Sequence, residues 1–165
     1  MSAQAVSFDS FQAVTFCLND GQKKEEYAIP IDQVREIRAV ESITKVPKAK
    51  SYVKGIMNLR GLIIPIIDVK EKLGLSSDNS NSAKQRILIA DVKGSLTGLL
   101  VDEVDQVMRI QTKDIEEAPQ AVLESHNHIQ GIAKNNDKLI VVLDAVRLLE
   151  DSSSEIQQAM EGSRQ

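Results

Sequence analysis

The sequence predicts a mainly β protein made of two small barrels that share one aliphatic core, with a few short helices. Apolar and polar residues alternate with a period of two along most of the chain, which is typical of strands with one buried face. The apolar residues are mostly aliphatic, because 42% of the 165 residues are hydrophobic and only 3% are aromatic. The strands and turns also repeat once along the chain.

Ten segments carry this alternation and are expected to form strands. Turn residues rich in Asn, Asp, Gly and Ser separate several of them, at residues 19–21, 93–95 and 135–137. The expected strands are residues 11–18, 26–31, 34–40, 55–59, 63–67, 86–92, 98–101, 104–110, 129–133 and 139–143.

Two short helices are expected, each directly after an aspartate. Asp68 precedes residues 69–73 and Asp144 precedes residues 145–149, so each carboxylate can accept hydrogen bonds from the first free amides of its helix. Gly74 suits the left-handed conformation that ends the first helix. Helix capping explains both aspartates, so we do not expect them to act as a catalytic pair.

The internal repeat aligns two blocks in the first half of the chain with two blocks in the second. Residues 55–68 align with residues 131–144 at an offset of 76, and residues 31–37 align with residues 101–107 at an offset of 70. About five short strands per copy cannot easily bury both faces of a flat sheet, so each copy is expected to curl into a small barrel. The alternative is one irregular sandwich with chance similarity.

Composition and charge exclude several classes of protein. The formal net charge is -4, whereas a dedicated nucleic-acid binder is expected to be basic. The lone Cys17 cannot form an internal disulfide, and no apolar run approaches the ~20 residues that a membrane span needs. We expect a cytoplasmic protein with one folded domain at residues 10–151 and flexible tails at residues 1–9 and 152–165.

The sequence offers little for catalysis, a metal or a cofactor. Cys17 lies in an alternating strand and is expected to be buried, and not activated by a nearby base. His126 and His128 are the only histidines, too few for a zinc centre, and are expected on the surface. No glycine-rich phosphate loop is present in the sequence. We therefore expect no enzyme activity, no metal and no cofactor.

Two charged segments at related places in the repeat suggest contacts between proteins. The first segment is basic, with Lys45, Lys48, Lys50 and Lys54, and the matching segment is acidic, with Asp114, Glu116, Glu117 and Glu124. Opposite charges at two related ends suit head-to-tail contacts between copies of a similar fold, because complementary potentials orient docking. Two solvated loops are the alternative.

Arg60 is a further candidate binding residue. It lies in an apolar strand-and-turn segment, residues 58–61, and an arginine in such a setting usually pairs with a carboxylate or meets a partner. Glu36 is a plausible intramolecular mate, so a structural and a binding role both remain open.

Residues 52–68, Tyr-Val-Lys-Gly-Ile-Met-Asn-Leu-Arg-Gly-Leu-Ile-Ile-Pro-Ile-Ile-Asp, resemble the signature of the CheW family of chemotaxis coupling proteins. Residues 31–37 resemble a second block of that family, and the resemblance covers residues 10–150. It implies two intertwined five-stranded SH3-like barrels with a hydrophobic groove between them. It also implies an adaptor without catalysis, which bridges the cytoplasmic tips of chemoreceptors to a CheA-type histidine kinase in signalling arrays. Membrane association would then be indirect, through the receptors.

The resemblance also assigns binding residues. The positions that match the family's receptor-facing groove are Val34, Glu36, Gly55, Asn58 and Arg60. For the kinase regulatory domain, Ile31 matches one contact, and Glu116 and Ala121 lie in a second, at residues 116–121. The family commonly has a basic and an aromatic residue at this second place, and this sequence departs from that pattern.

Other functions remain as alternatives. A CheW-like coupling protein of a non-flagellar pathway, such as twitching motility, would have the same features. A small hydrolase would need polar groups converging in one pocket, and a nucleic-acid-binding barrel would need more aromatic residues than the chain has.

Overall fold

The computed structural model describes residues 9–21, 23–75, 83–125 and 128–150. Most of the expected tails, and residues 76–82, lie outside these ranges. No helix within them is both long enough and apolar enough to cross a membrane.

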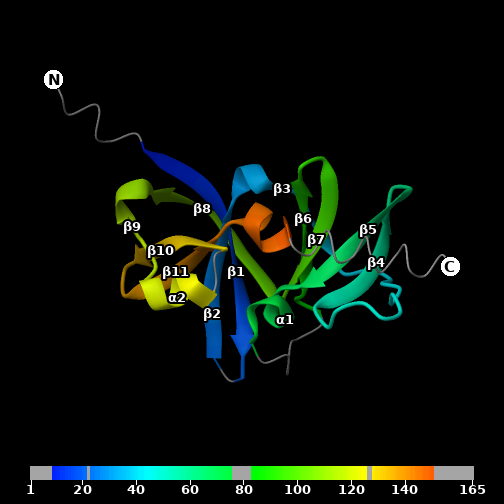
Figure 1. Cartoon of the computed structure of the whole chain (residues 1–165). Helices are drawn as coiled ribbons and strands as arrows, with labels where there is room; N and C mark the ends of the chain where they lie inside the picture. Colours follow the sequence, from blue (N-terminus) through cyan, green and yellow to red (C-terminus); the bar gives the residue numbers. More distant parts are fainter. Residues whose placement is uncertain (1–8, 22, 76–82, 126–127, 151–165) are drawn as a thin grey trace.

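The strands form two sheets that lie side by side (Figure 1). Sheet A has the order β8 (Glu103–Gln111), β1 (Ser10–Asp20), β2 (Lys23–Pro30), β11 (Lys138–Leu143), β10 (Ile129–Asn135) and β9 (Ile115–Glu116). Sheet B has the order β3 (Val34–Ala39), β6 (Arg86–Val92), β7 (Ser95–Val101), β5 (Leu62–Asp68) and β4 (Val53–Leu59). The prediction of a mainly β fold in two units is confirmed, with one extra short strand in sheet A.

The two sheets are interleaved copies of one arrangement. The order β8-β1-β2-β11-β10 in sheet A corresponds to β3-β6-β7-β5-β4 in sheet B. In each sheet one pair is parallel: Ile66 of β5 pairs with Gly98, and Val142 of β11 pairs with Ala28. Because Ile66 and Val142 are related by the repeat, the structure confirms the alignment. Sheet A is completed by the N-terminal hairpin β1–β2, so the two units are intertwined.

The apolar core has three parts. One cluster lies within sheet B, with Met57, Leu59, Ile64, Ile66, Ile87, Ile89 and Leu100. A second lies within sheet A, with Ala13, Ala28, Ile110, Ala133, Ile140 and Val142. The largest cluster takes side chains from β1, β2, β5, β6, β7 and β11 and from the short helices between the sheets. This third cluster is the shared aliphatic core that the sequence predicts, and it joins the sheets through buried apolar surface.

The two expected helices form between the sheets, and each is capped by its aspartate. The Asp68 carboxylate accepts hydrogen bonds from the amides of residues 70 and 71, at 3.0 and 3.4 Å, at the start of α1 (Val69–Leu73). The Asp144 carboxylate accepts from residues 146 and 147 at the same two distances, and residues 145–150 are helical. Gly74 ends α1 with a φ of 77°. Both capping predictions are therefore confirmed.

A buried ion pair ties α1 to the crossover between the sheets. Lys70 Nζ lies 3.1 Å from Asp102 Oδ2, and the two side chains are only 4% and 3% exposed. The same carboxylate oxygen accepts a hydrogen bond of 2.7 Å from the amide of Asn19 in β1. Removing one partner of such a pair leaves an uncompensated buried charge, so the pair favours one arrangement of the two sheets.

Candidate functional site

Arg60 lies in the turn of the hairpin β4–β5 and forms a two-pronged ion pair with Glu36 of β3. Its Nη2 is 2.7 Å from Glu36 Oε2 and its Nη1 is 3.2 Å from Oε1. Arg60 and Gly61 have φ values of 49° and 90°, as expected for a type I′ hairpin turn. The Asn58 side-chain oxygen accepts a hydrogen bond of 2.8 Å from the Gly61 amide and stabilises this turn. We call the ion pair of Arg60 with Glu36 the clamp.

The clamp is solvent-accessible and electrostatically reinforced. The Arg60 side chain is 65% exposed and that of Glu36 is 30% exposed. Hydrogen bonds from Arg60, and then from Arg38, lower the pKa of Glu36, while Glu36 raises the pKa of Arg60. Exposed ion pairs contribute little to stability, so the clamp mainly fixes the position of the guanidinium. The prediction that Glu36 pairs with Arg60 is confirmed, and the guanidinium remains reachable by a partner.

A β-bulge separates Val34 from Glu36. Along β3 the pairing with β6 shifts between these residues, so that Val34 pairs with Ala90 and Glu36 pairs with Ile89. Directly opposite residues share a face of the sheet. Ala90 belongs to the core between the sheets and Ile89 to the core within sheet B. The structure therefore places Val34 and Glu36 on opposite faces of β3.

A groove opens where β3 of sheet B approaches the start of β8 in sheet A. It has a volume of about 350 Å³ and is lined by Ile37, Lys84, Arg86, Glu103 and Val104. Ile37 is 41% exposed and pairs with Leu88, a member of the core between the sheets. A groove thus lies between the two units, but charged side chains line much of it, and its lining includes none of the five residues expected in the receptor-facing groove.

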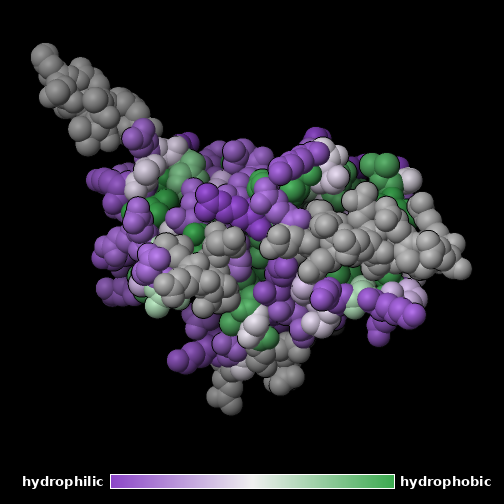
Figure 2. All heavy atoms as spheres, viewed as in Figure 1, coloured by the Kyte–Doolittle hydropathy of each residue, from purple (hydrophilic) through white to green (hydrophobic). Residues whose placement is uncertain are grey.

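The hairpin β4–β5 exposes further apolar surface next to the clamp. Leu62 and Ile63 are 57% and 64% exposed. Figure 2 shows hydrophobic side chains at the upper right, where this hairpin ends, on a face that is otherwise largely hydrophilic. Leu139, which the repeat relates to Ile63, is 60% exposed in sheet A. Sequence reasoning missed these residues, although their place beside the turn could have indicated exposure.

Gly55 allows the backbone at Thr44 to approach β4 closely. Its φ is 151°, and a Cβ atom there would overlap the Thr44 carbonyl oxygen. Thr44 forms a bridge with Ile56, through hydrogen bonds of 2.9 and 2.8 Å. Gly131, the repeat counterpart, is approached by Ile115 and Glu116 in the same way. Both glycines therefore admit a neighbouring backbone segment close to their own backbone.

The residues expected to contact a kinase lie on different elements. Ile31 begins the short 3-10 turn η2 (Ile31–Gln33) after β2 and is 38% exposed. Glu116 ends β9 and forms an ion pair of 2.8 Å with Lys134 of β10. Ala121 is exposed in α2 (Gln120–Ser125).

The two charged segments occupy equivalent places at opposite ends of the molecule. Thr44 pairs with Ile56 in sheet B, and Glu116 pairs with Ile132 in sheet A. Figure 1 shows the loop that follows Thr44 on the right and β9 on the left. The residues exposed in these segments are Lys45, Lys48, Lys50, Lys54, Asp114, Glu116 and Glu117. The side chain of Glu124 lies outside the described part.

The candidate catalytic residues do not form a reactive group. Cys17 is half-buried, less than expected, and burial raises the pKa of its thiol, which disfavours the nucleophilic thiolate. The expectation of a surface position is wrong for His128, which is 8% exposed, since it lies against the segment leading into the last helix; His126 lies outside the described residues. Within the described ranges no three His, Cys, Asp or Glu side chains are grouped to hold a metal.

Two interleaved sheets, an exposed clamp and exposed apolar edges define a β-rich binding module. Comparison with known proteins identifies its family. A model of the CheW-like domain matches residues 12–153. The chain therefore belongs to the CheW-like domain family, as the resemblance in its sequence implied.

Similar proteins support this assignment. The chain is 32% identical to the chemotaxis protein CheW of Helicobacter pylori over 148 residues, covering 90% of this chain and 87% of the relative. It is 33% identical to CheW of Bacillus subtilis, covering 79% and 84%. The crystal structure of the scaffolding protein TtCheW from Thermoanaerobacter tengcongensis matches with a TM-score of 0.76 and 35% identity, covering 85% and 92%. Family membership makes the chain a chemotaxis coupling adaptor.

Proposed function

We propose that this chain is a non-catalytic adaptor that couples the cytoplasmic tips of chemoreceptors to the regulatory domain of a CheA-type histidine kinase. Its place of action is the cytoplasm, at membrane-associated receptor arrays. The observation that carries the proposal is the clamp, which holds the Arg60 guanidinium exposed beside apolar residues within the segment that resembles the family signature.

The receptor surface is centred on β3. Among the strands of the described residues this strand pairs with β6 alone, and its other edge is left without a partner strand there. A helical hairpin lying across this edge can contact both faces of β3. It would meet Val34 on the face toward the groove, and Glu36 with Arg60 on the opposite face. Asn58 acts by stabilising the turn that carries Arg60, and Gly55 acts by admitting Thr44 against the backbone.

The kinase surface is centred on Ile31. An exposed isoleucine at the crossover between the sheets is an apolar anchor that a regulatory domain can bury. At the second expected contact, Glu116 is engaged by Lys134 and Ala121 offers little surface. We therefore assign the stronger kinase contact to Ile31.

The receptor role is tested with the purified chain and receptor-containing membranes in a co-sedimentation assay. Arg60→Ala is expected to weaken receptor binding by about tenfold or more, because a truncated arginine anchor costs on the order of 2 kcal/mol. Arg109→Ala is a matched control, since Arg109 is also an exposed arginine but lies on β8 of sheet A, where it donates a hydrogen bond of 3.1 Å to the Ser10 hydroxyl. The control is expected to bind as the wild type does. Equal receptor binding by all three proteins, each folded, would contradict the proposal.

A further inference from the structure

A second arginine holds the carboxylate of the clamp. Arg38 lies two residues after Glu36 on β3, and both pair with members of the core within sheet B, so they share a face of the strand. Arg38 Nη1 is 3.2 Å from Glu36 Oε1, the oxygen that Arg60 Nη1 also contacts at 3.2 Å. Arg38 Nη2 is 3.2 Å from Glu41 Oε1. Glu36 therefore accepts hydrogen bonds from two guanidiniums, and Glu41 anchors the second of them.

The two arginines differ in how far they are exposed to solvent. The Arg38 side chain is 29% exposed, whereas that of Arg60 is 65% exposed. Arg60 is therefore open to a partner, and Arg38 is set back against the sheet. Because Arg38 stays beside Glu36, this carboxylate keeps a neighbouring cation when a partner draws Arg60 away.

The fold gains little stability from Arg38. Its Nε is buried and has no hydrogen-bond partner within the described residues, and a buried donor left unpaired costs stability. Its ion pairs are partly exposed, and such pairs contribute little. Stabilisation of the fold is thus a poor explanation for an arginine at this position.

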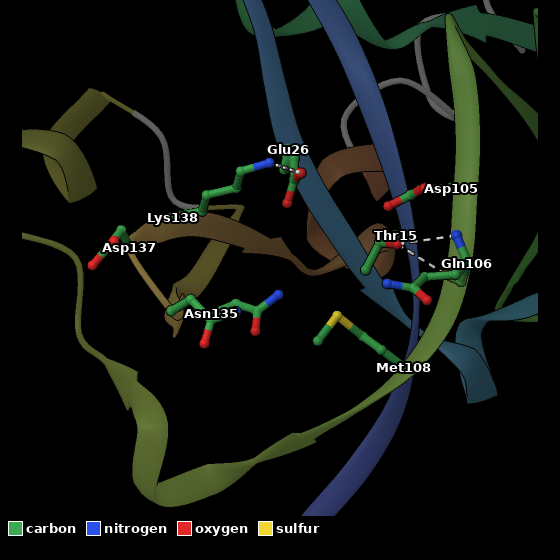
Figure 3. Close-up of a pocket in the computed structure, with 9 residues that line it drawn as sticks. Thr15, Glu26, Asp105, Gln106, Met108, Asn135, Asp137 and Lys138 are labelled. Atoms are coloured by element: carbon green, nitrogen blue, oxygen red, sulfur yellow. Dashed lines mark hydrogen bonds and ion pairs between the residues drawn. The ribbon is translucent and has the colours of Figure 1, made fainter.

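The other copy of the fold has neutral residues at all four positions of this network. Figure 3 shows Gln106 and Met108 on one side of β8, with their side chains directed toward the β10–β11 turn. Met108 pairs with Ala13 as Arg38 pairs with Ile87, each within the core of its own sheet. The fold therefore forms without the network, which indicates a role at the surface of sheet B. The repeat relates Glu36 to Gln106, Arg38 to Met108 and Glu41 to Gln111 at an offset of 70, and Arg60 to Asn136 at an offset of 76.

We infer that Arg38 is a positioning residue of the receptor surface: it holds the Glu36 carboxylate in place, and Glu36 in turn orients the Arg60 guanidinium toward the partner. The inference rests on the proposed function and adds Arg38, with Glu41 as its anchor, to the residues on which receptor binding depends. Arg38 acts through Arg60 and does not itself contact the receptor.

The first measurement uses the free protein. Arg38→Met removes the guanidinium and keeps an unbranched stem, and methionine already stands at the corresponding position of sheet A. We expect carboxyl ¹³C NMR to show a higher pKa for Glu36, because one of its two cationic hydrogen-bond donors is lost. We also expect guanidinium NMR to show faster rotation about the Nε–Cζ bond of Arg60, since the carboxylate that holds it is less firmly fixed.

The second measurement is receptor binding, by co-sedimentation with receptor-containing membranes. Arg38→Met is expected to weaken binding about fivefold, the effect of one net hydrogen bond. In the Arg60→Ala background the same substitution is expected to have no further effect, because no guanidinium remains to be positioned. Arg109→Met, at an exposed arginine of β8, is the control and is expected to change neither the pKa of Glu36 nor receptor binding.

Several results would overturn the inference. In the free Arg38→Met variant, an unchanged pKa of Glu36 or unchanged rotation of Arg60 would show that Arg38 does not position the clamp. Additive losses of receptor binding in the Arg38 and Arg60 variants would show that Arg38 acts by another route.

The same measurements separate this inference from the proposed function. Weakened binding by Arg60→Ala with full binding by Arg38→Met would overturn the inference and leave the proposed function standing. Full binding by both variants would contradict the proposed function and, with it, the inference. If Arg38→Met does not fold, Arg38→Lys decides by the same measurements, since lysine has a single nitrogen in place of the fork that joins Glu36 to Glu41.

Discussion

Arg60 holds a left-handed backbone conformation that arginine seldom adopts, with a φ of 49°. The type I′ turn imposes this conformation, and the guanidinium points toward Glu36 of β3, with which it forms the clamp. Because the ion pair is exposed, stability alone is a weak reason for such a residue at this position. Exposure and fixed geometry together suit recognition of a partner.

The protonation of Glu36 tests the clamp in solution. Hydrogen bonds from Arg60 and Arg38 lower the pKa of Glu36 in the folded state, so the contribution of the pair is present above the unfolded pKa and is lost as pH falls through the folded pKa. We expect Glu36 to titrate below the usual range for glutamate, and Arg60→Ala to raise its pKa. Carboxyl ¹³C NMR measures both values. The same Glu36 titration in the two proteins would show that the clamp is absent in solution.

At the residue scale, the pairing of Glu36 with Arg60 could be predicted from the sequence, as one of two open alternatives. The separation of Val34 from Glu36 could not, because the bulge between them follows from pairing with β6 and has no residue signature in β3. The buried ion pair of Lys70 with Asp102 could not be predicted either. The alternation of apolar and polar residues along the sequence assigns charged side chains to the surface, and both of these are buried.

At the element scale, the close approach of Thr44 to β4 gives sheet B its closing contact. The hydrogen bonds between Thr44 and Ile56 require the space that Gly55 leaves. The equivalent contact in sheet A is β9, where Glu116 pairs with Ile132 beside Gly131. The same device thus operates in both copies.

Substitution of Gly55 tests this device. Gly55→Ala is expected to lower the free energy of unfolding by more than Gly74→Ala. Both residues have positive φ, at 151° and 77°, but only at Gly55 would a Cβ meet other atoms. Strained backbone positions cost on the order of 1 to 3 kcal/mol, and the overlap at Gly55 adds to this cost. Urea unfolding measures the difference, and equal losses in the two variants would argue against the close approach.

The sequence predicted each of the ten longer strands and both capped helices at the element scale. It missed β9 because two residues carry no periodicity, and that strand exists only through its pairing with β10. It also missed α2, whose six residues lie in a segment interpreted only by its charge. Each of the two missed elements carries a residue of the expected second kinase contact, Glu116 in β9 and Ala121 in α2.

At the scale of the whole molecule, the two sheets share one large core but present different surfaces. The repeat predicted two related units, yet not that the hairpin β1–β2 would complete sheet A, because the sequence repeat was detected only in other segments. This interleaving brings Ile31, at the end of β2, to the crossover between the sheets. Surfaces on either sheet that bind a partner are therefore held by one framework, the two sheets joined through their shared core.

The basic and acidic segments lie at opposite ends of this framework. Such an arrangement orients the chain in an assembly without large individual contacts, since complementary potentials steer docking. Weak contacts gain effective strength when several act together in an array. This matches the role of a scaffold better than that of an enzyme.

The most direct test of the adaptor function is calorimetry of the purified chain with the regulatory domain of a co-resident CheA-type kinase. The wild type is compared with Ile31→Glu and with Val40→Glu. Val40 serves as the control because it is also an exposed β-branched aliphatic residue, with 36% of its surface exposed where Ile31 has 38%. We predict binding in the micromolar range for the wild type and for Val40→Glu, and its loss in Ile31→Glu. No binding by the wild type, or equal binding by all three proteins, would contradict the proposed function.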